Sequence, residues 1–278
     1  MHGGNGLAGS GQPMLLRPLI LGVLGGMGPL ATIDFMNKVI AATPAHRDQD
    51  HIPMIVHNDP RIPDRTQSIL ADNDDPLEPM TVGLRALEHA GADLCAIPCN
   101  TAHRWFDALS RISGMRLVHI VDAVRRKAPV GGALALMATR GTLAARVYQD
   151  RGPSNDRQWI LPTEPEQAVI DAAIAAVKAG NIVGPELSRV VRALRARGAD
   201  KVILACTELP IALKGQRLGT HCIDATTALA EECVRLAQAS RAGVPSMAVA
   251  ETAADWLDGF SKRNSPNLSM LRKGGARD

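Results

Sequence analysis

Two segments of this chain nearly repeat each other, and that repeat constrains the fold more than any other feature of the sequence. The first reads Gly-Ala-Asp-Leu-Cys-Ala-Ile-Pro-Cys over residues 91–99, and the second reads Gly-Ala-Asp-Lys-Val-Ile-Leu-Ala-Cys over residues 198–206. Each contains an apolar run suited to a buried strand, and each ends in a cysteine eight residues after its glycine. We therefore expect two equivalent strands that deliver Cys99 and Cys206 to equivalent places.

A second pair of segments repeats at nearly the same offset. Residues 24–31 read Leu-Gly-Gly-Met-Gly-Pro-Leu-Ala, and residues 137–144 read Met-Ala-Thr-Arg-Gly-Thr-Leu-Ala. Two pairs of similar elements at nearly one interval predict a duplicated α/β unit.

The remaining apolar runs and turn residues predict strands that alternate with helices. Besides the two cysteine strands, we expect strands at 19–24, 51–57, 117–120, 133–138 and 221–224, and helices at 29–42, 77–90, 100–112, 164–179, 184–197 and 225–239. Continuous apolar strands are typical of parallel sheets covered on both faces, whose sites lie beyond the carboxyl ends of the strands. The sequence thus predicts an α/β fold: two pseudosymmetric doubly wound parallel-sheet domains with the active site in the cleft between them.

The expected domains are discontinuous in sequence. Residues 15–122 together with 224–240 form the first α/β domain, and residues 123–223 form the second. Residues 1–14 are predicted to be a flexible tail because they are rich in Gly, Ser and Asn. Residues 241–278 are expected to be an appendage with a helix near 250–260.

The composition excludes several classes of function. A net charge of +3 is small for 278 residues, so neither nucleic acid nor an anionic membrane is an expected partner. The apolar run 19–33 is broken by glycines and a proline, which favours strand, turn and helix over a signal peptide or membrane span. Five cysteines, an odd number without the spacing of a disulfide framework, indicate a reducing, cytoplasmic setting.

Cys99 and Cys206 stand where a strand changes into a helix. A helix N-terminus favours an anion and lowers the pKa of a thiol from its free value of about 8.5. Two such thiols across a cleft suit the removal of a proton from one face of a carbon and its return to the other, with one thiolate and one thiol at the start. For Cys95, Cys222 and Cys233 we expect ordinary core packing instead.

A metal site and a redox dithiol are weaker interpretations of the cysteines. Cys95 and Cys99 on one strand would be about 13 Å apart, too far to share an ion with His103. Cys99 and Cys206 do not form a Cys-x-x-Cys motif. His103 is expected either to pack near the site or to support it.

The glycine-rich turn fits the pattern Gly26-x-Gly28-x-x-Ala31, a weak match to the dinucleotide fingerprint. Asp59, the nearest acid after the second strand, follows about thirty residues later instead of about twenty. We therefore expect no nicotinamide cofactor but a small carboxylate bound by helix-terminal N–H groups. Side-chain donors at the same level are Asn100, Thr101, Thr139 and Thr207.

Taken together, six motifs resemble those of the aspartate/glutamate racemase family, and its aspartate racemases most. They are Gly-Gly-Met-Gly-Pro at 25–29, Asn-Asp-Pro at 58–60 with Ile-Pro-Asp-Arg-Thr at 62–66, Pro-Cys-Asn-Thr-Ala-His at 98–103, Ala-Thr-Arg-Gly-Thr at 138–142, Lys-Ala-Gly-Asn at 178–181 and Cys-Thr-Glu at 206–208. The resemblance covers about residues 19 to 240. One departure is Ala205, where many relatives have glycine.

The resemblance implies a racemase without metal, pyridoxal phosphate or other cofactor, in which Cys99 and Cys206 are the two acid/base thiols. It implies that Arg65 and Lys178 hold the side-chain carboxylate of a dicarboxylic amino acid, and that the enzyme is a homodimer. The positions that it implies line the cleft are Met27, Asn58, Asn100, Thr101, Thr139 and Thr207.

The expected function is therefore the interconversion of L- and D-aspartate. One methylene is worth only about 1–3 kcal/mol, so the sequence does not separate aspartate from glutamate. The alternatives are a broader aspartate/glutamate racemase, or a superfamily isomerase or decarboxylase acting on another small acid. A dehydrogenase and a two-lobed binding protein are more distant rivals.

Overall fold

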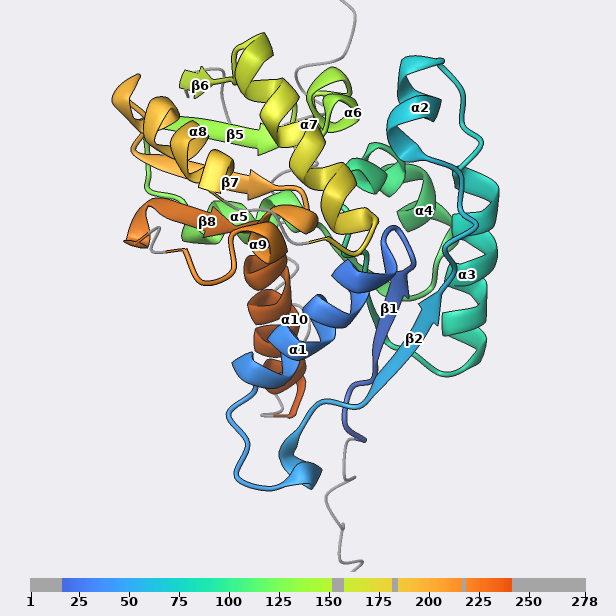
Figure 1. The fold of residues 1–278 in the computed structure, drawn as a ribbon. Coiled ribbons are helices and arrows are strands. Elements are labelled where there is room, and N and C mark those ends of the chain that lie inside the picture. The colour runs from blue at the N-terminus through green and yellow to red at the C-terminus, as the bar shows by residue number, and fades with distance from the viewer. Residues whose placement is uncertain (1–16, 152–157, 182–184, 217–218, 242–278) are drawn as a thin grey trace, which may run out of the picture. The chain divides into compact units, whose positions relative to one another are not determined.

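A computed structural model describes residues 17–151, 158–181, 185–216 and 219–241. The first half of the chain builds a parallel sheet with strand order β2-β1-β3-β4 (Figure 1). Its strands are β1 (Leu21–Gly25), β2 (Met54–Asn58), β3 (Leu94–Ala96) and β4 (Arg116–Val118). Its helices are α1 (Pro29–Ala42), α2 (Arg65–Leu70), α3 (Leu77–His89), α4 (Phe106–Ile112) and α5 (Ile120–Lys127), with short 3-10 helices at Asp48–Asp50 and Thr101–Trp105.

The second half repeats this plan with strand order β6-β5-β7-β8, again parallel (Figure 1). Its strands are β5 (Ala133–Ala138), β6 (Gln158–Ile160), β7 (Lys201–Ala205) and β8 (Cys222–Asp224). Its helices are α6 (Arg140–Ala144), α7 (Glu164–Lys178), α8 (Pro185–Ala196), α9 (Glu208–Ala212) and α10 (Ala225–Arg241), with a 3-10 helix at Gly219–His221. The two cysteine strands, β3 and β7, hold the same position in their sheets, so the predicted fold class is confirmed.

Apolar side chains fill both faces of the central strands. Leu21, Val23 and Leu24 of β1 are fully buried, and so are residues 135–138 of β5. Because each sheet is covered by helices on both sides, its strands show no alternation of polar and apolar residues. Each half has its own hydrophobic core, one around β3 and the other around β7.

The last helix returns to the first half. In α10, Glu231 and Glu232 pair with Lys127 and Arg126 of α5. Burial, followed by the neighbouring Cys95 of β3, raises the pKa of the α10 thiol Cys233. Residues 17–238 form one compact unit, so the domain boundaries within it remain a prediction. The predicted tail, the appendage and its helix near 250–260 lie outside the described residues.

Several local predictions differ from the structure for identifiable reasons. The first cysteine strand ends at Ala96, because Pro98 lacks the N–H that a ladder needs. A 3-10 helix then precedes α4, where one continuous helix was expected. No helix was expected at residues 65–70, where α2 lies with its first turn capped by the side chain of Asp64.

Candidate active site

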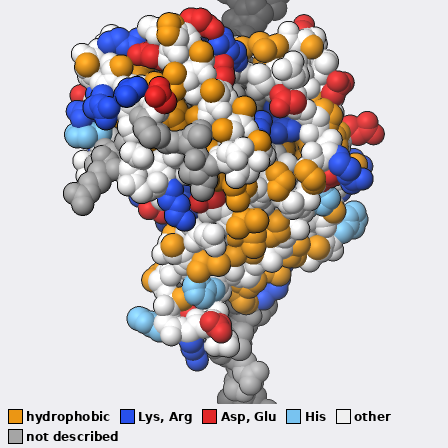
Figure 2. Space-filling view, in the orientation of Figure 1, with side chains coloured by type: hydrophobic (Ala, Val, Ile, Leu, Met, Phe, Trp, Pro, Cys, Tyr) orange, Lys and Arg blue, Asp and Glu red, His pale blue; other side chains and the backbone are white. Residues whose placement is uncertain are grey.

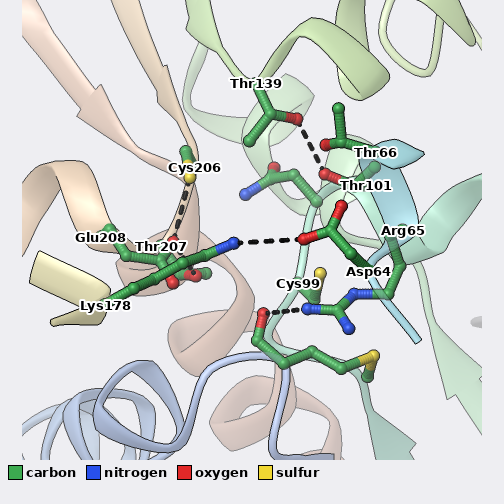
Figure 3. Close-up of a pocket in the computed structure, with 12 residues that line it drawn as sticks. Asp64, Arg65, Thr66, Cys99, Thr101, Thr139, Lys178, Cys206, Thr207 and Glu208 are labelled. Carbon is green, nitrogen blue, oxygen red and sulfur yellow. Dashed lines mark hydrogen bonds and ion pairs between the residues drawn. The ribbon is translucent and has the colours of Figure 1, made fainter. Parts of the chain in front are cut away.

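The two cysteines line one cavity (Figure 3). Cys99 follows β3 and Cys206 follows β7, so equivalent strands deliver both sulfurs. Figure 3 shows Cys206 and Glu208 on one side and Cys99 with Arg65 on the other, while Lys178 reaches across toward Asp64. The complete lining is Met27, Asp64, Arg65, Thr66, Cys99, Asn100, Thr101, Thr139, Lys178, Cys206, Thr207 and Glu208.

This lining contains all the predicted site residues except Asn58. That residue ends β2, is exposed to solvent and does not line the cavity. The structure adds three residues that sequence reasoning missed, namely Asp64, Thr66 and Glu208. All three lie within the quoted motifs, Asp64 and Thr66 beside Arg65 and Glu208 two residues after Cys206, and this proximity was the signal that could have found them.

The Cys206 thiol donates a hydrogen bond to Glu208 Oε2 at 3.0 Å, and Thr207 Oγ1 donates to the same oxygen at 3.1 Å. Burial raises the pKa of Cys206 well above its ordinary value of 9.0, and the charge and hydrogen bond of Glu208 raise it further. A lowered pKa was expected from the helix N-terminus, so for Cys206 this expectation was wrong. The α9 helix that follows has only five residues, and burial and a carboxylate outweigh its dipole.

Cys99 is 6% exposed, and its backbone is hydrogen-bonded to the side chain of His103. The Nδ1–H of His103 donates to the carbonyl of Cys99 at 2.9 Å, and Nε2 accepts from the N–H of Ile120 at 3.1 Å. Burial lowers the pKa of His103 to about 4, so the ring is neutral at pH 7. His103 does not line the cavity, and its position matches the supporting role left open by the sequence.

Arg65 presents a positive charge at the cavity without a carboxylate partner among the described residues. Arg65 is 8% exposed, and its guanidinium donates to three backbone carbonyls, those of Met27, Ile62 and Pro63. These neutral carbonyls fix the geometry of the guanidinium, and no carboxylate of the described residues forms a salt bridge with it. A buried cation in this state favours an anionic ligand.

Lys178 at the end of α7 is the second cation, and it pairs with Asp64 at 3.7 Å. Burial alone would raise the pKa of the Asp64 carboxyl, but the Gln67 N–H and the charges of Lys178 and Arg65 lower it. Asp64, Arg65 and Lys178 also line a neighbouring hollow beside the start of α1. The ion pair therefore joins the two halves of the chain at the cavity.

Three threonine hydroxyls connect the halves at the other side of the cavity. Thr101 Oγ1 lies 2.9 Å from Thr139 Oγ1 and 2.9 Å from Thr142 Oγ1, which are themselves 3.0 Å apart. Each hydroxyl has one hydrogen, so three contacts use all three hydrogens. Thr101 and Thr139 line the cavity as predicted, but their hydrogens are engaged in this ring.

The glycine-rich turn after β1 has a packing role. Gly26 adopts a φ of +93°, and a Cβ there would lie 2.3 Å from the backbone of Asp59. The Gly26 N–H donates to Thr32 Oγ1 at 2.9 Å, so it is not available to a phosphate. The turn therefore needs glycine for close backbone packing. This requirement explains the weak match to the dinucleotide fingerprint without invoking a bound dinucleotide.

Duplicated parallel sheets whose equivalent strands are followed by two cysteines at a cation-lined cavity define a class of α/β proteins with paired thiols. Residues 24–233 match the family model described as Asp/Glu/Hydantoin racemase. The chain belongs to this family.

Individual relatives are similar over most of their length. The broad specificity amino-acid racemase RacX of Bacillus subtilis is 29% identical over 222 residues, which cover 77% of this chain and 96% of RacX. The structure of the Picrophilus torridus aspartate racemase is 28% identical with a TM-score of 0.66, covering 79% of this chain and 94% of the other. An aspartate racemase homologue from Pyrococcus horikoshii, 23% identical with a TM-score of 0.62 over 78% of this chain and 98% of that chain, shares the fold.

Proposed function

We propose that this protein is an amino-acid racemase that interconverts L- and D-aspartate without pyridoxal phosphate, metal or another cofactor. The observation that carries the proposal is that Cys99 and Cys206 follow equivalent strands and line one cavity together with Arg65 and Lys178. Two thiols from opposite halves address opposite faces of one carbon. Two neighbouring cations suit a substrate that carries a side-chain carboxylate.

The proposed chemistry uses one thiolate and one thiol. Because burial and Glu208 keep Cys206 protonated, the proposal gives Cys206 the role of proton donor and Cys99 that of the base. The Cys99 sulfur removes the α-proton, and the Cys206 S–H bond breaks as its proton reaches the opposite face of the carbanion. The other enantiomer reacts with the two sulfurs in exchanged roles.

Substrate binding is assigned to the charged and polar lining. Arg65 and Lys178 hold the side-chain carboxylate of the substrate. To do so, Lys178 leaves its ion pair with Asp64 and pairs with the substrate carboxylate. Asn100 and Thr207 face the cavity with polar groups near the two sulfurs. Preorganised donors of this kind stabilise the charge that develops on the α-carboxylate when the proton leaves.

Aspartate is the proposed substrate because this chain resembles an aspartate racemase over almost the whole length of that enzyme. The similarity to RacX supports a second candidate, a racemase of broader specificity. The purified protein should be incubated with L-aspartate, L-glutamate and a panel of neutral and basic amino acids, with chelator and without added cofactor. Chiral chromatography should show D-aspartate forming fastest. Comparable rates across the panel would support the second candidate, and no D-product from any amino acid would exclude both.

A homodimer is part of the same proposal. Figure 2 shows hydrophobic side chains gathered over α1, where Leu30, Ile33 and Ile40 are 43%, 56% and 46% exposed. An apolar helix face of this kind fits a second copy of the chain. Ile33→Glu should lower the molar mass measured by light scattering, and an unchanged dimer would exclude this face.

A cytoplasmic location is proposed because all five cysteines are free thiols. Among the described residues, no helix has the length and apolar character needed to span a bilayer.

A further inference from the structure

One hydrogen bond beside Cys99 comes from a residue outside the cavity. Tyr148, the only tyrosine of the chain, donates from its hydroxyl to Asn100 Oδ1 at 2.6 Å. Tyr148 follows α6 in the second half, while Asn100 directly follows Cys99 in the first. Tyr148 is 1% exposed and does not line the cavity, so it acts on a ligand only through another residue.

The direction of this hydrogen bond is fixed by the phenol. Burial raises the pKa of Tyr148 well above its ordinary value of 10.0, and the charges of Asp224 and Cys206 raise it further. The hydroxyl therefore keeps its proton, and that proton needs an acceptor. Among the two ends of the Asn100 amide only Oδ1 accepts, so the amide is held with Oδ1 toward Tyr148 and Nδ2 away from it.

The Nδ2 group of Asn100 is buried and has no hydrogen-bond partner among the described residues. The residue is 2% exposed and lines the cavity beside Cys99. A buried N–H group without an acceptor costs about 1–3 kcal/mol, which a ligand oxygen would recover. The threonine hydroxyls at the same level have their hydrogens engaged with one another, so Asn100 offers the unengaged donor there.

We propose that Tyr148 is a positioning residue that orients the Asn100 amide, so that Nδ2 donates to a carboxylate oxygen of the bound amino acid. The inference rests on the proposed function, because it assigns the ligand as an amino acid. Without the phenol proton, the amide loses the contact that determines which end faces the cavity. Its acceptor oxygen would then face the carboxylate in part of the molecules, where it repels.

The kinetic test is a double-mutant cycle of Tyr148→Phe and Asn100→Ala. Tyr148→Phe removes only the hydroxyl and should lower kcat/KM by roughly ten- to a hundredfold. In the Asn100→Ala background the same change should have almost no further effect, because no amide is left to orient. Trp159→Phe is the matched control, since Trp159 packs against the Tyr148 ring with centroids 6.3 Å apart and leaves the hydroxyl in place. An equal loss from Tyr148→Phe in both backgrounds would overturn the inference.

A binding test works without turnover. In ¹⁵N-labelled protein the side-chain amide signal of Asn100, assigned from its loss in Asn100→Ala, should shift when succinate or L-aspartate is added. In Tyr148→Phe this signal should change before ligand is added and respond less to it. A normal response in a wild-type protein that does not racemise would contradict the proposed function alone. An Asn100 signal that ignores both ligands in wild type, or responds equally in Tyr148→Phe, would overturn the inference.

Discussion

Cys206 Sγ lies 3.0 Å from Glu208 Oε2, and the thiol donates a hydrogen bond to that carboxylate. The opposite sulfur, Cys99, has no such hydrogen bond to a carboxylate within the described residues, and its backbone carbonyl instead accepts a hydrogen bond from His103. The two halves of the chain repeat each other in topology, but the two thiols do not repeat each other in environment. An electrostatic interaction with Cys99 also raises the pKa of Cys206, so the two sulfurs influence each other across the cavity.

This asymmetry predicts a pH effect for Glu208→Gln. The amide removes the negative charge that raises the pKa of Cys206, so that pKa falls toward its ordinary value. Activity needs Cys206 as a thiol, and the alkaline limb of kcat/KM should therefore move to lower pH. Glu208→Asp keeps the charge and serves as the control. An alkaline limb in the same place for Glu208→Gln and wild type would show that Glu208 does not govern this thiol.

The ion pair between Asp64 and Lys178 predicts opposite changes in KM. Asp64→Asn should lower KM for aspartate by about two- to fivefold, because Lys178 then has no ion pair within the protein to break before it binds the substrate carboxylate. Asparagine also caps helices, so α2 should keep its first turn. Lys178→Met should instead raise KM by about tenfold or more. Initial rates at two salt concentrations measure both changes, and a raised KM in Asp64→Asn would contradict this account.

The threonine ring predicts a stability effect away from the substrate. Thr142 is fully buried and does not line the cavity. Thr142→Val leaves Thr101 and Thr139 short of one partner and should lower the free energy of unfolding by about 1–2 kcal/mol. Thr142→Ser retains the hydroxyl and should lose clearly less in urea unfolding. Equal losses in the two variants would show that the methyl group, not the ring, provides the stability.

His103 predicts how stability depends on pH. Its pKa is about 4 in the folded protein against an ordinary value of 6.5, so below pH 6.5 the unfolded chain binds a proton that the folded protein refuses. The contribution is therefore present above pH 6.5 and is lost as the pH falls toward 4. The buried His119, whose pKa is also lowered by burial, acts in the same direction. Urea midpoints at pH 7 and pH 5 should differ less in His103→Gln than in wild type, and an unchanged difference would exclude this role.

The fold was largely predictable because its signals are local. Apolar runs, the Gly-Ala-Asp segments and the turn before α1 each sit within a few residues, and their repetition predicted the duplicated sheets. The same segments place Cys99 and Cys206 at the carboxyl ends of parallel strands, a position that topology alone determines.

The site was less predictable where side chains meet from distant segments. Nothing near Tyr148 in the sequence points to Asn100, and the ring of threonines closes only when α6 meets the first half. Glu208 stands in a noted motif, but its effect on the Cys206 pKa depends on burial, which the sequence does not show. Asn58 illustrates the reverse case, because a position expected in the cleft is exposed at the end of β2.

The most direct test of the two-thiol account follows the α-proton of L-aspartate by NMR in D₂O, without cofactor, with wild type, Cys99→Ala and Cys206→Ala. Wild type should replace the α-proton with deuterium while D-aspartate appears, and each single variant should lose racemisation because one of the two proton carriers is missing. Full racemisation by either variant, or an α-proton that persists in wild type, would contradict the account.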